Sequence, residues 1–352
     1  MNQSHCHVFA LGIALSLIST ATVTASDESA VRAAMTTSAG ANVATLDELA
    51  ARGAEIVPLV EPYLQDPDRA VKSRALTVLS RIDGVGSKYV LRALRSDDPI
   101  MQDLGAMHAR NFPSDPDVAK ALCKRVMQDG ESFVRRAALG VLSEHMATAD
   151  TRKAAQAMMP QIVKDLGSYD LPLARACVFF LGRYAKKGDQ DVLHALNELQ
   201  TSVENKQHPG VARLDRSDAG NRRGIKVLQA IKVAEAGLGY EDAFRKLSDH
   251  VSKESKDRST YLRLLVHLRP SPQSIELLAA LLEDETEVEQ LAQSHLPFTV
   301  YRRTCDLVAD AVGAWYPDAP GLHVGSRIYP ADELDALRQW LADLPESRFS
   351  DG

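Results

Sequence analysis

Two stretches of the sequence repeat one pattern at a fixed distance. Residues 66–76 read DPDRAVKSRAL and residues 129–139 read DGESFVRRAAL, and each is followed three residues later by a further Leu. Both continue from an Asp in a turn-forming context into V-x-x-x-A-L-x-x-L. Apolar residues at i, i+4, i+5 and i+8 lie on one face of an α-helix. The repeated positions are Asp66, Val71, Ala75, Leu79, Asp129, Val134, Ala138 and Leu142.

The two stretches are 63 residues apart (134 − 71), which fits two units of 31 or 32 residues. Weaker copies follow Asp97 and Asp170, and a degraded copy occupies residues 300–312. Another amphipathic stretch precedes each copy, so one unit is a pair of helices with an Asp capping the second helix. Such a pair cannot bury its apolar face alone, whereas stacked pairs share a continuous core. The sequence therefore predicts an all-α solenoid of stacked helix–turn–helix repeats.

The segments 66–76 and 134–139 resemble HEAT repeats, and the unit length is similar to the short HEAT-like repeats first described in phycobilisome bilin lyases. The resemblance covers residues 55–185 and fades over residues 225–316. It implies an α-solenoid and no particular activity, because HEAT arrays include scaffolds, adaptors and a few enzymes.

Basic residues recur near the starts of the second helices, at Lys72, Arg135, Arg136 and Arg175. A basic stripe on one face of an array could bind a ligand. The resemblance implies a second role, in which Asp66, Asp129 and Asp170 contact basic residues of neighbouring repeats. We favour the second role because charge-assisted pairs between repeats explain both residue types.

The composition excludes several classes of protein. The 352 residues carry a net charge of −6, with 45% hydrophobic and 5% aromatic residues. The low aromatic content argues against an extensive β-sandwich or barrel. The acidic balance argues against a nucleic-acid partner, which would require a basic footprint.

The N-terminus predicts export. Residues 1–25 contain no Asp, Glu, Lys or Arg, residues 8–18 are apolar, and residues 23–25 (VTA) have the small-x-small form of a cleavage site. We expect a signal peptide over residues 1–25 and a periplasmic or secreted protein. The alternative is a membrane anchor formed by a retained segment 8–25.

The remaining chain is divided by its patterns into four parts. These are a HEAT-like array (26–185), a helix with a long basic loop (186–224), degenerate repeats (225–316), and an irregular segment with a capping helix (317–352). An odd set of three cysteines, Cys123, Cys177 and Cys305, predicts buried free thiols. A Cys123–Cys177 bridge is the alternative.

Motifs for catalysis are absent from the sequence. It contains no H-E-x-x-H, C-x-x-C, phosphate-binding glycine loop or G-x-S-x-G, so we predict no catalytic residue, metal or cofactor. The Asp-Pro-Asp segments at 66–68 and 115–117 are interpreted as helix caps instead of calcium ligands. The acidic run 283–289 is interpreted as a solvated turn.

The segment 206–226 is the candidate binding element. It carries six basic residues, Lys206, Arg213, Arg216, Arg222, Arg223 and Lys226, against two acidic ones. This local excess of positive charge could contact an acidic protein, an anionic glycan or a lipid head group, whereas a plain solvated loop is the simpler explanation. We expect an exported HEAT-like scaffold or adaptor with an unknown, acidic protein partner. The alternatives are a lyase-like or cofactor-handling enzyme, or enzyme subunit, and a membrane-anchored assembly factor.

Overall fold

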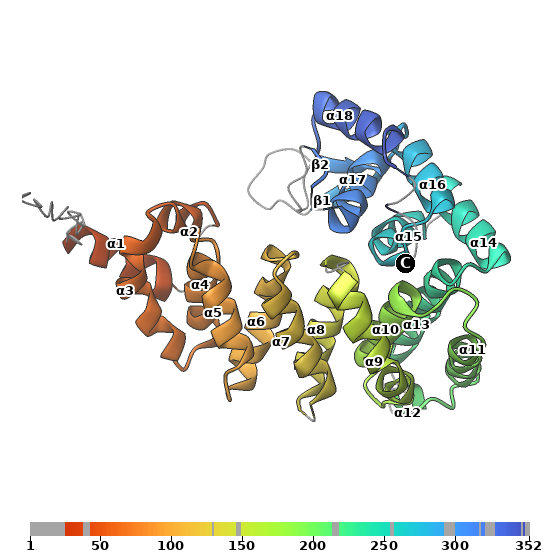
Figure 1. Cartoon of the computed structure of the whole chain (residues 1–352), viewed down its shortest axis with the longest axis horizontal. Coiled ribbons are helices and arrows are strands. Elements are labelled where there is room, and N and C mark those ends of the chain that lie inside the picture. The colour runs from red at the N-terminus through yellow and green to blue at the C-terminus, as the bar shows by residue number, and fades with distance from the viewer. Residues whose placement is uncertain are drawn as a thin grey trace, which may run out of the picture. The chain divides into compact units, whose positions relative to one another are not determined.

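The computed structural model describes residues 25–37, 43–128, 130–145, 149–212, 218–253, 257–291, 300–316, 318–320, 328–345 and 348. Over these residues the chain is helical apart from loops and one short β-hairpin (Figure 1). The predicted all-α, repeat-based fold is therefore confirmed. No helix in the described ranges has both the length and the apolar character needed to span a membrane. The predicted signal peptide lies outside the described residues except for Ala25, which begins the first helix.

The chain divides into two compact units, residues 1–82 and 83–352. The first contains α1 (Ala25–Thr36), α2 (Val43–Ala50), η1 (Gly53–Ile56), α3 (Val57–Val60), η2 (Glu61–Gln65) and α4 (Arg69–Ser80). Arg74 of α4 donates two hydrogen bonds, of 3.0 and 2.6 Å, to the carbonyl of Met35. These bonds fix α4 to the end of α1.

The cap of the first repeat helix lies two residues later than the predicted cap, Asp66. Asp68 is the residue that caps α4, because its carboxylate accepts from the amide of Ala70 at 2.7 Å. The Asp66 carboxylate accepts from the amide of Asp68 at 2.8 Å and shapes the turn before the helix. The apolar positions Val71, Ala75 and Leu79 are buried.

The second unit begins with two layers of stacked helices. In chain order they are α5 (Gly86–Leu94), α6 (Pro99–His108), η3 (Ala109–Asn111), α7 (Pro116–Met127), α8 (Ser132–His145), α9 (Ala149–Asp165) and α10 (Leu171–Tyr184). The odd-numbered helices pack beside one another, α5 on α7 and α7 on α9, and α6, α8 and α10 form the other layer. This i to i+2 packing is the arrangement expected of helix pairs that share one core.

Aspartates cap these helices as predicted. Asp98, Asp115 and Asp170 accept from amides of α6, α7 and α10, respectively. Asp129 lies outside the described residues. No group of three His, Cys, Asp or Glu residues in the described part of the chain is placed to hold a metal ion.

Contacts between repeats use different partners from those that the HEAT resemblance implied. Arg135 of α8 pairs with Asp165 at the end of α9, and it also donates to the carbonyl of Val126 at 3.0 Å. Asp170 accepts from the hydroxyl of Ser132 at 2.5 Å. A basic residue therefore does join neighbouring helices, but its carboxylate partner comes from the end of the following helix.

The second copy of the repeat predicts which side of α8 faces the core. A substitution at Ala138 tests that prediction. Val134, Ala138 and Leu142 are all buried, and Ala138 is fully enclosed. Ala138→Phe should lower the free energy of unfolding by about 1–3 kcal/mol, because the ring would overpack the layer. Ala157→Phe on the exposed side of α9 is the matched control and should change stability by no more than about 0.5 kcal/mol. Equal denaturation midpoints for the two variants would contradict this assignment of the inner face.

The remaining elements complete the second unit. They are α11 (Gln190–Glu204), α12 (Pro209–Ala212), α13 (Asp218–Gly237), α14 (Glu241–Ser252), α15 (Arg258–Leu264), η4 (Leu265–His267), α16 (Pro272–Leu282), β1 (Glu287–Leu291), β2 (Val300–Arg303), α17 (Thr304–Trp315) and α18 (Ala331–Ala342). The antiparallel hairpin β1–β2 was not predicted. Residues 300–303, which were predicted to begin the degraded repeat helix, form strand β2 instead. Part of the acidic run, from Glu287 on, forms strand β1.

The C-terminal elements fold back on the layer of α8 and α10. Segment η4 contacts both helices, and α17 contacts α8. Arg183 of α10 donates to the carbonyl of Leu268 at 2.7 Å, and Arg269 donates to the carbonyls of Arg183 and Ala185 at 3.1 and 2.5 Å. A cation at the C-terminal end of α10 is favoured by the helix dipole. This reciprocal pair therefore fastens η4 to α10.

The three cysteines in the described residues are free thiols. Burial raises the pKa of Cys123 to about 11 and raises the pKa of Cys177 and Cys305 as well. At pH 8 roughly a thousandth of Cys123 is thiolate, so the native protein should react slowly with a disulfide reagent, and faster as pH rises. In denaturant all cysteines should react. Two missing thiols under denaturing conditions would indicate the Cys123–Cys177 bridge instead.

Candidate binding surfaces

Residues 206–212 and 218–226, the described parts of the segment 206–226, include two helical stretches. Helix α12 packs there so tightly that a Cβ on Gly210 would lie 2.4 Å from the carbonyl oxygen of Tyr169. The buried ring of His208 contacts the carbonyl of Leu166 at 3.2 Å. The described parts of the predicted 16-residue loop therefore include an anchored short helix, α12, and the start of α13, whereas residues 213–217 lie outside the described residues.

The six predicted binding residues lie in three places. Lys206 is exposed just after α11 with a positive φ of 57°. Arg222, Arg223 and Lys226 are exposed on the first turns of α13. Arg213 and Arg216 lie outside the described residues. The three cations of α13 lie within five residues of one another, so they form one local basic surface.

The acidic run 283–289 is a mostly exposed turn over residues 283–286, as predicted, and continues as strand β1 from Glu287. Its carboxylates pair with arginines from three other elements: Arg338 with Glu283, Arg258 with Asp284, Arg303 with Glu285, and Arg263 with Glu289. Burial alone would raise the pKa of Asp284, but hydrogen bonds from Thr286 and Arg258 hold that pKa below its usual value. These ion pairs connect the run to α15, β2 and α18 within the same chain.

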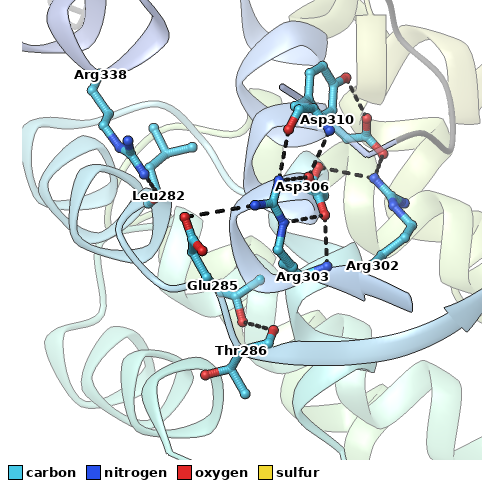
Figure 2. A network of polar contacts seen from close by, with 10 residues as sticks. Leu282, Glu285, Thr286, Arg302, Arg303, Asp306, Asp310 and Arg338 are labelled. Atoms are coloured by element: carbon cyan, nitrogen blue, oxygen red, sulfur yellow. Dashed lines mark hydrogen bonds and ion pairs between the residues drawn. The ribbon is translucent and has the colours of Figure 1, made fainter. Parts of the chain in front are cut away.

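A buried polar network joins β2 to α17 and the segment before α18 (Figure 2). The fully buried carboxylate of Asp306 accepts four hydrogen bonds. Three come from the amide, Nε and Nη2 of Arg303 at 2.8, 3.2 and 3.1 Å, and one comes from the amide of Tyr329 at 2.9 Å. Arg303 also donates to the carbonyl of Tyr329 at 2.8 Å. Four donors occupy the acceptor sites of this carboxylate, so Asp306 holds β2, α17 and the segment before α18 together.

A second carboxylate extends the network. Asp310 accepts from Arg302 at 2.6 Å and from the hydroxyl of Tyr329 at 2.9 Å. Burial raises the pKa of Asp310, and Arg302 opposes that effect. Sequence analysis missed both carboxylates because they lie in a segment interpreted as a degraded repeat.

An aromatic and charged cluster lies where η4 meets α8 and α10. The ring of His267 stacks on Phe179 with centroids 3.6 Å apart, and the guanidinium carbon of Arg175 lies 5.0 Å from the same ring centroid. His267 Nε2 lies 3.7 Å from a carboxylate oxygen of Glu144. Burial lowers the pKa of Arg175, and Glu144 opposes that effect. These groups pack against each other, so we infer that they help to hold η4 against α8 and α10.

Helix α5 carries a basic face that sequence analysis did not identify. Lys88, Arg92 and Arg95 are exposed at i, i+4 and i+7, which places them along one side of the helix over about 10 Å. They line a shallow concavity of about 680 Å³ together with Ser87, Leu91, Ser96 and Asp97. Helix α5 contains no acidic residue.

The basic face continues onto the neighbouring helix. Lys120 and Lys124 of α7 follow Lys88 and Arg92 by 32 residues (120 − 88 and 124 − 92), are exposed, and lie on a helix that packs beside α5. We call Lys88, Arg92, Arg95, Lys120 and Lys124 the α5–α7 basic face. Comparing the polar residues that lie 32 positions apart, as was done for the apolar ones, would have revealed the α5–α7 basic face in the sequence.

The sequence matches no known protein-family model, and no curated protein is significantly similar to it.

Proposed function

We propose that the protein is an exported, HEAT-like scaffold that binds an acidic protein through the α5–α7 basic face. The observation that carries the proposal is the set of five exposed cations on two adjacent repeat helices, in a chain whose net charge is −6. No catalytic chemistry is proposed.

The chemistry of the face favours carboxylates presented by a protein. Arg92 and Arg95 offer planar guanidinium groups that can bind carboxylates through two parallel hydrogen bonds, and lysines add point charges. Leu91 gives the concavity an apolar element. A nucleic acid carries about one charge per 1.7 Å of duplex and would draw the acidic remainder of the protein close to its phosphates.

The cations of α13 form a second part of the proposal. Arg222, Arg223 and Lys226 are exposed, so they can add to the attraction of an acidic partner at longer range. Each exposed ion pair contributes little, typically about 0–1 kcal/mol, and salt weakens it. The two surfaces should therefore affect association rate more than stability of the fold.

A defined polyanion tests the proposed function without an identified partner. The purified protein should bind immobilised polyglutamate at about 0.01 M salt, and K88E/R92E should weaken that binding by roughly tenfold. The variant K186E/K187E makes the same change of charge at exposed positions after α10 and should bind as the wild type does. Equal losses in both variants, or tighter binding to duplex DNA than to polyglutamate, would contradict the proposal.

The predicted export of the protein through a cleaved signal peptide can be tested separately. Mass spectrometry of the protein from the native cell should find a mature chain that begins at Ser26. A chain that retains residues 8–25 would favour the membrane-anchored alternative.

A further inference from the structure

Helix α18, the last α-helix among the described residues, presents the opposite charge to that of α5. Asp332, Asp335 and Asp343 are exposed at the outer side of α18, whereas Leu334, Leu337 and Leu341 are buried against the rest of the fold. Arg338 is the only basic residue of the helix. It donates to the carbonyl of Leu282 at 2.6 Å and pairs with Glu283 as well as Asp335.

The carboxylate of Asp335 remains accessible despite its pairing with Arg338. The Asp335 side chain is 70% exposed, and the Arg338 side chain is 23% exposed. One guanidinium shared among a carbonyl and two carboxylates cannot neutralise the outer side of α18. The outer side thus keeps a net negative charge.

We propose that α18 of a second copy of this chain docks on the α5–α7 basic face. This inference rests on the proposed function, because both use the α5–α7 basic face. It specifies that the acidic group bound there is α18 of another copy. Asp332 and Asp335 are about 4.5 Å apart along their helix axis, and Lys88 and Arg92 are about 6 Å apart along theirs. Long lysine and arginine side chains span that difference, so two carboxylates can meet two cations at once.

The two surfaces lie on the first and the last helices of the unit 83–352. A contact between two different surfaces is heterologous, so each copy offers one basic face and one acidic helix. Copies can therefore join head to tail. The ion pairs are exposed, so the association should be weak, dependent on concentration and sensitive to salt.

Sedimentation velocity of the purified full chain tests this inference. At about 0.01 M salt, where charges interact over ~30 Å, the wild type should self-associate as concentration rises, and at about 1 M salt, where the range is ~3 Å, it should be monomeric. K88E/R92E and D332K/D335K should each be monomeric in both conditions. An equimolar mixture of the two variants should associate again, because the intact α18 of one variant meets the intact basic face of the other and the two reversed surfaces are complementary as well.

Two further variants control for charge and for folding. E241K/D242K changes two acidic residues in the first turn of α14, one of which pairs with Arg245 three residues later, as Asp335 does with Arg338. It should associate as the wild type does. The chain with all four swaps, K88E/R92E/D332K/D335K, should regain association, which shows that the faces fold and only the charges matter.

Several results would overturn the inference. They are a wild type that stays monomeric at low salt, a mixture of variants that stays monomeric, or an equal loss of association in E241K/D242K. Failure of the proposed function is distinguishable because D332K/D335K keeps the basic face. If the wild type stays monomeric at low salt while D332K/D335K still binds polyglutamate and K88E/R92E does not, the proposed function stands and the docking of α18 falls.

Discussion

Gly182→Ala should lower the free energy of unfolding by about 3 kcal/mol, the upper end of the usual cost of overpacking. A Cβ at Gly182 would lie 2.5 Å from Cα and 2.8 Å from Cβ of Ala234 on α13. The backbones meet again at Gly237, where a Cβ would lie 2.7 Å from the carbonyl oxygen of Gly182. Backbone atoms cannot rotate away as a flexible side chain can. One methyl group should therefore force α10 and α13 apart, and urea denaturation measures the loss.

Gly140→Ala provides the matched control with the opposite sign. Gly140 lies within α8, and a Cβ there would have no neighbour within 4 Å. Alanine in a helix interior is favoured over glycine by about 0.5–1 kcal/mol, so this variant should be more stable than the wild type. The double variant G182A/A234G should recover only part of the loss, because the Ala234 Cα remains in place. Stabilisation by Gly182→Ala would contradict the close approach of α10 and α13.

Asp306→Ala should cost about 3–5 kcal/mol, because it leaves the buried part of Arg303 and the amide of Tyr329 without their acceptor. The Asp306 carboxylate is fully buried, whereas the Arg303 side chain is 21% exposed. Asp306→Asn should cost less than Asp306→Ala, since its one remaining oxygen still accepts from one of the two amides, which donate to different oxygens of the carboxylate. Thermal unfolding followed by the fluorescence of Trp315 on α17 measures both variants near the site of change.

Asp335→Ala is the control for Asp306→Ala. Like Asp306, Asp335 pairs with an arginine three residues away in the sequence, but at an exposed position. Exposed pairs contribute about 0–1 kcal/mol, so this variant should melt close to the wild type. If both variants lost the same stability, the network around Asp306 would be no more important than a surface ion pair.

The sequence predicted the repeat core well because burial acts locally on a helix. The positions of Ala75 and Ala138 follow from one period of apolar residues, and both side chains are fully enclosed. The capping residues follow from the same local rules, although Asp68 took the role expected of Asp66. These features depend on residues within one or two turns, so a pattern in the sequence is enough to find them.

Features made by distant residues were not predicted. The strand β1 is rich in glutamate, which is uncommon in strands, and its stability depends on pairing with β2 and on ion pairs such as that of Arg263 with Glu289. The carboxylate and its arginine are 26 residues apart, and no local pattern links them. The candidate binding surface was missed for another reason. Its cations are ordinary exposed residues until the packing of α5 beside α7 places them on one face.

The return of η4 and α17 onto α8 and α10 has a consequence for the folding kinetics. In an ideal repeat array each unit touches only its neighbours, so folding can start anywhere and the ends can fray independently. Here the hydrogen bond from Arg183 to Leu268 links residues 85 positions apart. Closing so long a loop has an entropic cost before the contact forms, which slows folding. The helices from α8 to α17 should therefore exchange their amide hydrogens as one cooperative block, while α5 and α6 open on their own.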